Sequence, residues 1–201
     1  ELGSAQHANL TILDKYYDKA IKYLIYGNVL KNNTYPLSVS AERVFQAIEA
    51  IKYAKSVGAS AIAHGSTGAG NDQIRFDLIF QTIAPEIEII TPIRDLKLSR
   101  QEEVDYLSKN GVHYSWEKAQ YSINKGLWGT SVGGKETLTS AKPLPNEAYP
   151  SQLTKEGEEK VTLEFLKGEL VAVNGIKDKP SNNIVALEKL ANAYAIGRDI
   201  H

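Results

Sequence analysis

The stretch from Ala63 to Phe76 holds the residues of this chain that are best suited to binding chemistry. It reads Ala-His-Gly-Ser-Thr-Gly-Ala-Gly-Asn-Asp-Gln-Ile-Arg-Phe, and three glycines fall within six positions. Glycines leave backbone N–H groups uncovered, and a helix beginning near Asn71 would direct its positive end at the same space. A hydroxyl, an amide, a carboxylate and a guanidinium stand in the same stretch, on Thr67, Asn71, Asp72 and Arg75. This mixture of donors and charges suits a zwitterionic ligand beside a phosphate.

Two other segments carry hydroxyl groups that could hold a ligand. The segment Tyr35-Pro36-Leu37-Ser38-Val39-Ser40 places Ser40 at the expected start of a helix, where a hydroxyl can bind a carboxylate. Further along, Ser122 and Ser131 lie nine residues apart across an expected glycine-bearing loop. The three segments supply many hydrogen-bonding groups and no nucleophile–base pair, which favours binding and orienting of substrates over nucleophilic catalysis.

Each segment also has a plain structural interpretation. A glycine-rich turn between a strand and a helix can exist for geometry alone, and this one matches neither the Walker loop nor the dinucleotide fingerprint. His64 can be a hydrogen-bonded histidine at a strand end, and Ser40 can simply cap a helix. Trp128 can anchor an ordinary surface loop. The pattern by itself leaves these alternatives open.

Apolar periodicity and turn residues predict the elements that would position these segments. We expect helices over 14–32, 40–57, 71–82, 99–111 and 181–196, and strands over 60–63, 87–90, 161–165 and 170–173. The alternation in the first half predicts an α/β fold with a doubly wound parallel sheet, whose ligands bind beyond the carboxyl ends of the strands. Long loops begin after residue 114, so we expect an α/β domain over 1–114 and an α+β domain over 115–201.

The composition argues against several classes of function. The 201 residues have a formal net charge of −1 and no basic block, so we expect no binding to nucleic acid. No apolar stretch approaches the ~20 residues of a membrane-spanning helix, and we expect no membrane partner. The lack of cysteine excludes disulfides and cysteine metal sites and fits a cytoplasmic protein. Methionine is also missing, and we expect the chain to be the central part of a longer protein.

These segments together resemble the argininosuccinate synthase family. That family carries a Tyr-Pro-Leu-x-x-Ser element, which matches 35–40 here, and an Ala-His-Gly-x-Thr-Gly-x-Gly-Asn-Asp-Gln-x-Arg-Phe element, which matches 63–76. It also carries two serines nine apart around Leu-Trp-Gly, which match 122–131. The three elements occur in the family's order, and the resemblance extends over nearly the whole chain. The second element is highly specific.

The resemblance implies an activity and an assembly. Members join citrulline to aspartate in arginine biosynthesis, with ATP and Mg²⁺, through a citrullyl-AMP intermediate. The implied fold is an adenine nucleotide alpha hydrolase-like domain followed by a synthetase domain that binds citrulline, and the implied assembly is a homotetramer. The family's N-terminal pyrophosphate loop and C-terminal arm have no counterpart in this sequence, so we expect residues 1–201 alone to lack ligase turnover.

The resemblance also implies roles for individual residues. Gly65 would contact ATP through its backbone; Thr67, Asn71 and Asp72 would hold aspartate; and citrulline would contact Tyr35, Ser40, Asn71, Arg75, Ser122 and Ser131. It implies no catalytic side chain and no metal-binding side chain in this chain. Ala69 stands where the family usually has a lysine. Two alternatives remain open: another adenylating enzyme of the same superfamily, and a non-catalytic module that binds amino acids or nucleotides.

Overall fold

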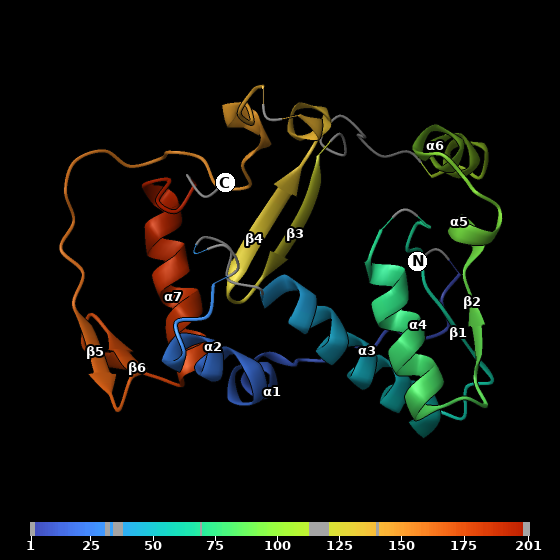
Figure 1. Ribbon diagram of the computed structural model, residues 1–201, viewed down its shortest axis with the longest axis horizontal. Helices are drawn as coiled ribbons and strands as arrows, with labels where there is room; N and C mark the ends of the chain where they lie inside the picture. Colours follow the sequence, from blue (N-terminus) through green and yellow to red (C-terminus); the bar gives the residue numbers. More distant parts are fainter. Residues whose placement is uncertain are drawn as a thin grey trace. The chain divides into compact units, whose positions relative to one another are not determined.

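A computed structural model of the chain describes residues 3–30, 33, 38–68, 70–112, 121–139 and 141–198 (Figure 1). The chain divides into two compact units. The first unit comprises Glu1–Leu13 and Glu42–Glu103, and the second comprises Asp14–Ala41 and Val104–His201. Each unit is described by itself below. The domain boundary expected near residue 115 stays a prediction.

The first unit is built on a β–α–β arrangement. Its elements are α3 (Ser38–Ser56), most of which lies in this unit, β1 (Ala61–Ala63), α4 (Asp72–Ile83), β2 (Glu88–Ile90), α5 (Pro92–Asp95) and the start of α6 (Arg100–Lys109). The strands pair in parallel, with Ile62 opposite Ile89, and α4 forms the crossover between them. Parallel pairing needs such a crossover, so the predicted α/β character is confirmed for this unit. The predicted doubly wound sheet is represented, in the described residues, by this two-stranded sheet.

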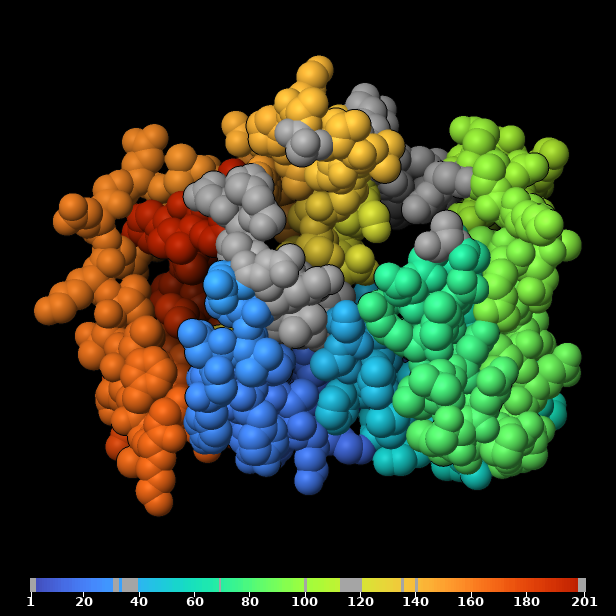
Figure 2. Space-filling view, in the orientation of Figure 1, coloured from blue at the N-terminus to red at the C-terminus, as the bar shows by residue number. Residues whose placement is uncertain are grey.

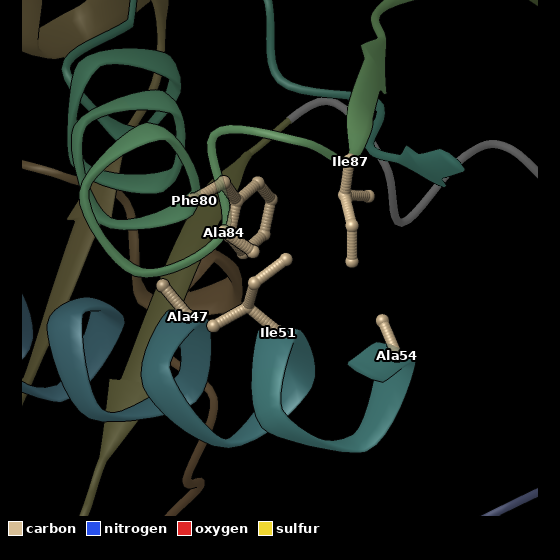
Figure 3. Packing of buried hydrophobic residues seen from close by; sticks show 6 residues of the cluster. All are labelled: Ala47, Ile51, Ala54, Phe80, Ala84 and Ile87. Carbon is tan, nitrogen blue, oxygen red and sulfur yellow. The ribbon is translucent and has the colours of Figure 1, made fainter. Parts of the chain in front are cut away.

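The core of the first unit lies where α3 packs against α4. Helical spacing brings Ala47, Ile51 and Ala54 to one side of α3. They pack against Phe80, Ala84 and Ile87 from α4 and the segment after it (Figure 3). Ile51 and Ala47 are fully buried. This contact fixes α4 and therefore the position of the chain that leads into it.

Local sequence signals explain how the helices of the first unit begin. Ser99 and Glu102 form a capping box: the Glu102 carboxylate accepts from the Ser99 N–H at 2.7 Å, and Ser99 Oγ accepts from the Glu102 N–H at 3.3 Å. Helix α3 begins at Ser38, two residues earlier than predicted, so Ser40 lies in its first turn and is not its cap. The predicted capping role of Ser40 was therefore wrong.

The second unit combines two antiparallel sheets with helices. Its elements are α1 (Leu13–Tyr16), the π-helical turn η1 (Tyr17–Ile21), α2 (Lys22–Tyr26), β3 (Ser122–Gly126), β4 (Gly129–Gly133), the 3-10 turns η3 (Lys135–Leu138) and η4 (Asn146–Ala148), β5 (Leu163–Leu166), β6 (Glu169–Val173), β7 (Ile176–Lys177) and α7 (Pro180–Ala193). Strands β5, β6 and β7 form one sheet and β3 and β4 the other. Within the described ranges, no helix has both the length and the apolar character that a membrane span requires.

Polar contacts join the parts of the second unit. Glu169 on β6 accepts hydrogen bonds from the hydroxyls of Tyr17 and Tyr26, each at 3.0 Å. Asn183 of α7 is 2% exposed and donates to the backbone carbonyls of Leu170 and Asp178. A buried amide needs such partners, so Asn183 holds α7 against β6.

Two predictions for the second unit were wrong. The helix expected over 14–32 ends at Tyr26, because Gly27 and Asn28 close it and Asn28 adopts a left-handed φ of 45°. The segment 122–131, expected to be a flexible loop, is a β-hairpin in which Gly126 pairs with Gly129 across a turn of Leu127 and Trp128. Its glycines sit at the tight end of the hairpin. By contrast, the hairpin of β5 and β6 turns at Lys167 and Gly168, between the two strands expected over 161–165 and 170–173.

Replacement of Ile51 by alanine should lower the free energy of unfolding by about 2–5 kcal/mol, because it opens a cavity in the core between α3 and α4. The matched control is Leu78→Ala. Helix α4 lies at the surface on the face drawn in Figure 2, and Leu78 is 60% exposed. The control should change stability by less than about 0.5 kcal/mol. Urea unfolding followed by circular dichroism measures both, and equal losses would contradict this assignment of the core.

Candidate functional site

The glycine-rich turn, residues 64–71, lies at the carboxyl end of β1. The backbone N–H of His64 donates to the carbonyl of Ile90 at 3.1 Å and so continues the pairing of β1 with β2. Helix α4 then begins at Asp72. The turn therefore occupies the edge of the parallel sheet where α/β proteins bind ligands, as the sequence predicted.

The three glycines of this turn are not required by the backbone conformation. Gly65, Gly68 and Gly70 do not have a left-handed φ, whereas Gly58 and Gly111 have φ values of +68° and +77°. A Cβ added at the three turn positions would lie 3.8, 3.7 and 3.5 Å from its nearest neighbour, which is ordinary van der Waals contact. Geometry alone therefore does not account for these glycines.

Several hydrogen-bonding groups of the turn have no partner among the residues that the structure describes. These are the N–H groups of Gly65, Thr67 and Gly68, the hydroxyl of Thr67 and the side-chain amide of Asn71. Asn71 occupies the N-cap of α4, yet its side chain caps no N–H group there. The exposed side chains of Thr67 and Asn71 thus offer hydrogen bonds beside a positive helix end.

Charged groups gather around Asp72 at the start of α4. Its Oδ1 accepts from Arg75 Nη1 at 2.6 Å, and its Oδ2 lies 3.4 Å from Nε of Arg43 on α3. The Arg43 guanidinium is held in turn by Gln46, whose Oε1 lies 2.8 Å from Nη1. Two cations around one carboxylate suit a ligand that carries both a carboxylate and an ammonium group. The sequence showed Arg43 in the helix but not its contact with Asp72, because the two residues are 29 positions apart.

His64 is a hydrogen-bonded strand-end histidine, which was the plain interpretation of this residue. Its Nε2 lies 2.8 Å from Oδ1 of Asp77, and its Nδ1 accepts from the backbone N–H of Ser66 at 3.3 Å. Burial raises the pKa of the Asp77 carboxyl, but hydrogen bonds from Arg94 and His64 outweigh it and hold the pKa below its usual value. No sequence pattern gave a role to Asp77 or Arg94.

The hairpin of the second unit brings Ser122 and Ser131 to one face. Ser131 is paired with Asn124, and Ser122 with Gly133, so all of these positions share a face. Since the other pair on that face is Gly126 with Gly129, Ser122, Asn124 and Ser131 supply its only side chains in the hairpin. Strand pairing thus fixes the spacing of the two serines, and Asn124 joins the set that the sequence predicted.

The remaining predicted site residues fall elsewhere. Ser40 is half-buried in the first turn of α3. Tyr35 and Ala69 lie outside the described residues. The structure therefore brings together Gly65, Thr67, Asn71, Asp72 and Arg75 in the first unit, and Ser122 with Ser131 in the second.

Comparison with known proteins identifies the family. Residues 1–113 match the family model described as the arginosuccinate synthase N-terminal HUP domain, a nucleotide-binding α/β domain. The argininosuccinate synthase of Sulfolobus acidocaldarius is 36% identical over 200 residues, which cover 99% of this chain and 51% of the relative. That of Methanocaldococcus jannaschii is 36% identical over 201 residues, covering 98% and 51%, and that of Dictyoglomus turgidum is 34% identical over 202, covering 100% and 51%. The chain spans about half the length of these relatives, and it belongs to the argininosuccinate synthase family.

Proposed function

We propose that this chain forms part of an ATP-dependent ligase that condenses citrulline with aspartate to give argininosuccinate. The observation that carries the proposal is the turn at 64–71. Its glycines are not required by the backbone conformation, and the N–H groups of Gly65, Thr67 and Gly68 have no partner among the described residues. Charged groups of both signs stand beside it. Such a site suits a phosphate next to an amino acid.

The proposed reaction has two steps. The ureido oxygen of citrulline attacks the α-phosphorus of ATP, the bond to the β-phosphate breaks, and pyrophosphate leaves. The amine of aspartate then attacks the ureido carbon of citrullyl-AMP. The bond from this carbon to the former ureido oxygen breaks, and AMP leaves with that oxygen. Both nucleophiles belong to the substrates, so the protein contributes orientation and charge stabilisation. A protein that only orients its substrates needs no nucleophile–base pair, and the segments 35–40, 63–76 and 122–131 contain none.

The first unit would hold ATP and aspartate. The N–H of Gly65 would donate to ATP, while the Thr67 hydroxyl and Asn71 amide would bind a carboxylate of aspartate. Asp72 would accept the aspartate ammonium, since Arg43 and Arg75 already hold its two oxygens in place. Arg75 and Asn71 would also contact citrulline. Charge-assisted hydrogen bonds of this kind are roughly twice as strong as neutral ones.

The second unit would supply further citrulline contacts. Ser122 and Ser131 would donate or accept from one face of the hairpin. We add Asn124 because, on that face, it is paired with Ser131 and lies two residues from Ser122 on β3. Ser40 and Tyr35 complete the proposed set. The homotetramer and a cytoplasmic location, implied by the family resemblance, belong to the proposal as well.

We propose that Mg²⁺ is held by the phosphates of ATP. Among the described residues, no group of three or more His, Asp or Glu side chains could hold a metal ion. Mg²⁺ commonly keeps several waters and binds through substrate phosphates. When bound there, it would neutralise charge on the pyrophosphate leaving group.

The decisive experiment supplies the full-length protein with citrulline, aspartate, ATP and Mg²⁺. Citrulline labelled with ¹⁸O in its ureido group should yield argininosuccinate and AMP, with the label in the AMP phosphate. Formation of ADP, or unlabelled AMP, would contradict the adenylated intermediate. Binding of the substrates without any product would favour the non-catalytic module.

Replacement of Asp72 by asparagine in the full-length protein should weaken use of aspartate. A charged hydrogen bond contributes about 1.5–3 kcal/mol, so the KM for aspartate should rise roughly 10- to 150-fold. The KM for ATP should change much less. The control is Asp18→Asn, which removes a more exposed carboxylate 3.7 Å from Lys22. Steady-state kinetics with each substrate varied in turn measures this, and an unchanged KM for aspartate would remove Asp72 from the site.

Replacement of both Ser122 and Ser131 by alanine should impair use of citrulline. Each neutral hydrogen bond contributes about 0.5–1.5 kcal/mol, so the KM for citrulline should rise roughly 5- to 150-fold. Thr130→Ala is the matched control, because Thr130 lies on the opposite face of the same hairpin. The same kinetic assay decides between the two interpretations. Equal shifts for all three substrates, or a similar effect of the control, would argue for a purely structural role.

A further inference from the structure

A polar network behind the glycine-rich turn holds it at two points. Asp77 of α4 accepts from His64 Nε2 at 2.8 Å on one oxygen and from Arg94 Nη1 at 2.5 Å on the other. The same Arg94 nitrogen donates to Gln73 Oε1 at 3.2 Å, and Gln73 Nε2 donates to the carbonyl of Gly68 at 2.6 Å. The carboxylate of Asp77 is thus connected to both the start and the middle of the turn.

The partners of His64 determine which ring nitrogen carries its proton. The backbone N–H of Ser66 points at Nδ1, so Nδ1 must be the acceptor. Nε2 then carries the proton and donates it to Asp77. A carboxylate accepts only, and therefore favours this tautomer over the alternative.

The surroundings of the network keep it in place. The side chains of His64 and Asp77 are 10% and 20% exposed. The imidazole ring packs beside the rings of Phe76 and Phe80, at centroid distances of 5.6 and 6.3 Å. Arg94 is fixed from its other side by the hydroxyl of Thr91, which is 1% exposed and lies 2.9 Å from Nη2. The ring therefore has little freedom to find other partners.

We infer that Asp77 is a positioning residue for the ligand-binding turn. It holds His64 in the Nε2–H form, and this keeps Nδ1 available to the N–H of Ser66. The peptide groups on either side, at Gly65 and Thr67, then stay in the arrangement that receives the ligand. The identity of that ligand, ATP at Gly65 and aspartate at Thr67, rests on the proposed function; the hydrogen-bond network does not.

Replacement of Asp77 by asparagine tests the inference because it alters the donors with almost no change in size. The amide carbonyl can still accept from Arg94, which leaves the NH₂ group facing Nε2 of His64. Two donors cannot pair, so the ring proton moves to Nδ1 and meets the N–H of Ser66. We expect the KM for ATP of the full-length protein to rise about tenfold or more, with little change for citrulline. Asp95→Asn is the control, since Asp95 contacts Thr91 and Arg94 but not His64, and should change the same KM less than about twofold.

A second replacement should rescue the first. Asparagine at position 64 can accept the N–H of Ser66 by forming an Asx-turn with the residue two positions on, without any tautomer. The double variant His64→Asn with Asp77→Asn should therefore regain most of the ATP affinity, although it loses the ring packing against Phe76. If the role of Asp77 is in folding alone, the KM for ATP of the double variant should be higher than that of Asp77→Asn.

The tautomer can be measured without substrates. In the ¹⁵N spectrum of histidine-labelled protein, His64 should be protonated at Nε2 in the wild type and at Nδ1 in Asp77→Asn. A wild-type ring protonated at Nδ1, or a KM for ATP that shifts no more in Asp77→Asn than in Asp95→Asn, would overturn the inference. Lack of ligase turnover in the wild type would count against the proposed function alone, because the ring spectrum decides the positioning role independently.

Discussion

The parallel pairing of β1 with β2 is the constraint on which the position of the glycine-rich turn depends. Parallel strands need a crossover, and α4 provides it. The pairing also brings the carboxyl ends of both strands to one edge, where His64 follows β1 and Thr91 follows β2. Asp77 lies in the second turn of α4. It therefore contacts His64, which follows β1, and Arg94, which lies in the segment after β2.

Packing of α3 on α4 is the second constraint on the arrangement of charged groups at the start of α4. The cluster around Ile51 and Phe80 fixes how the two helices cross, and this sets the distance between Arg43 and Asp72. The hydrophobic contact is thus responsible for the charge arrangement at the opposite end of α4. Two backbone groups of the turn, the N–H of Ser66 and the carbonyl of Gly68, are hydrogen-bonded to the side chains of His64 and Gln73. The N–H groups of Gly65, Thr67 and Gly68 have no partner within the described residues.

Sequence patterns were sufficient where local chemistry decides the structure. The strand–turn–helix order around 61–83, the capping box at Ser99 and the hairpin turn at Lys167-Gly168 follow from short-range rules. They failed for the hairpin of β3 and β4, because glycines at both strand ends look like loop residues when strand pairing is not known. The contacts of Asp72 with Arg43 and of Asp77 with Arg94 depend on tertiary packing, so no spacing rule could reveal them. Family resemblance supplied roles for residues whose patterns alone were ambiguous.

The glycines of this chain differ in the origin of the constraint on them, and this has an evolutionary consequence. Gly58 and Gly111 have backbone angles that other residues adopt at a cost, so folding itself preserves them. Gly65 and Gly68 have room for a methyl group among the described residues, and under the proposed function a bound ligand would collide with it. In a lineage that kept this fold and lost its ligand, Gly65 and Gly68 would drift to other residues while Gly58 and Gly111 persisted. The pattern of glycine loss among relatives would then distinguish a relative that has lost ligand binding from one that has kept it.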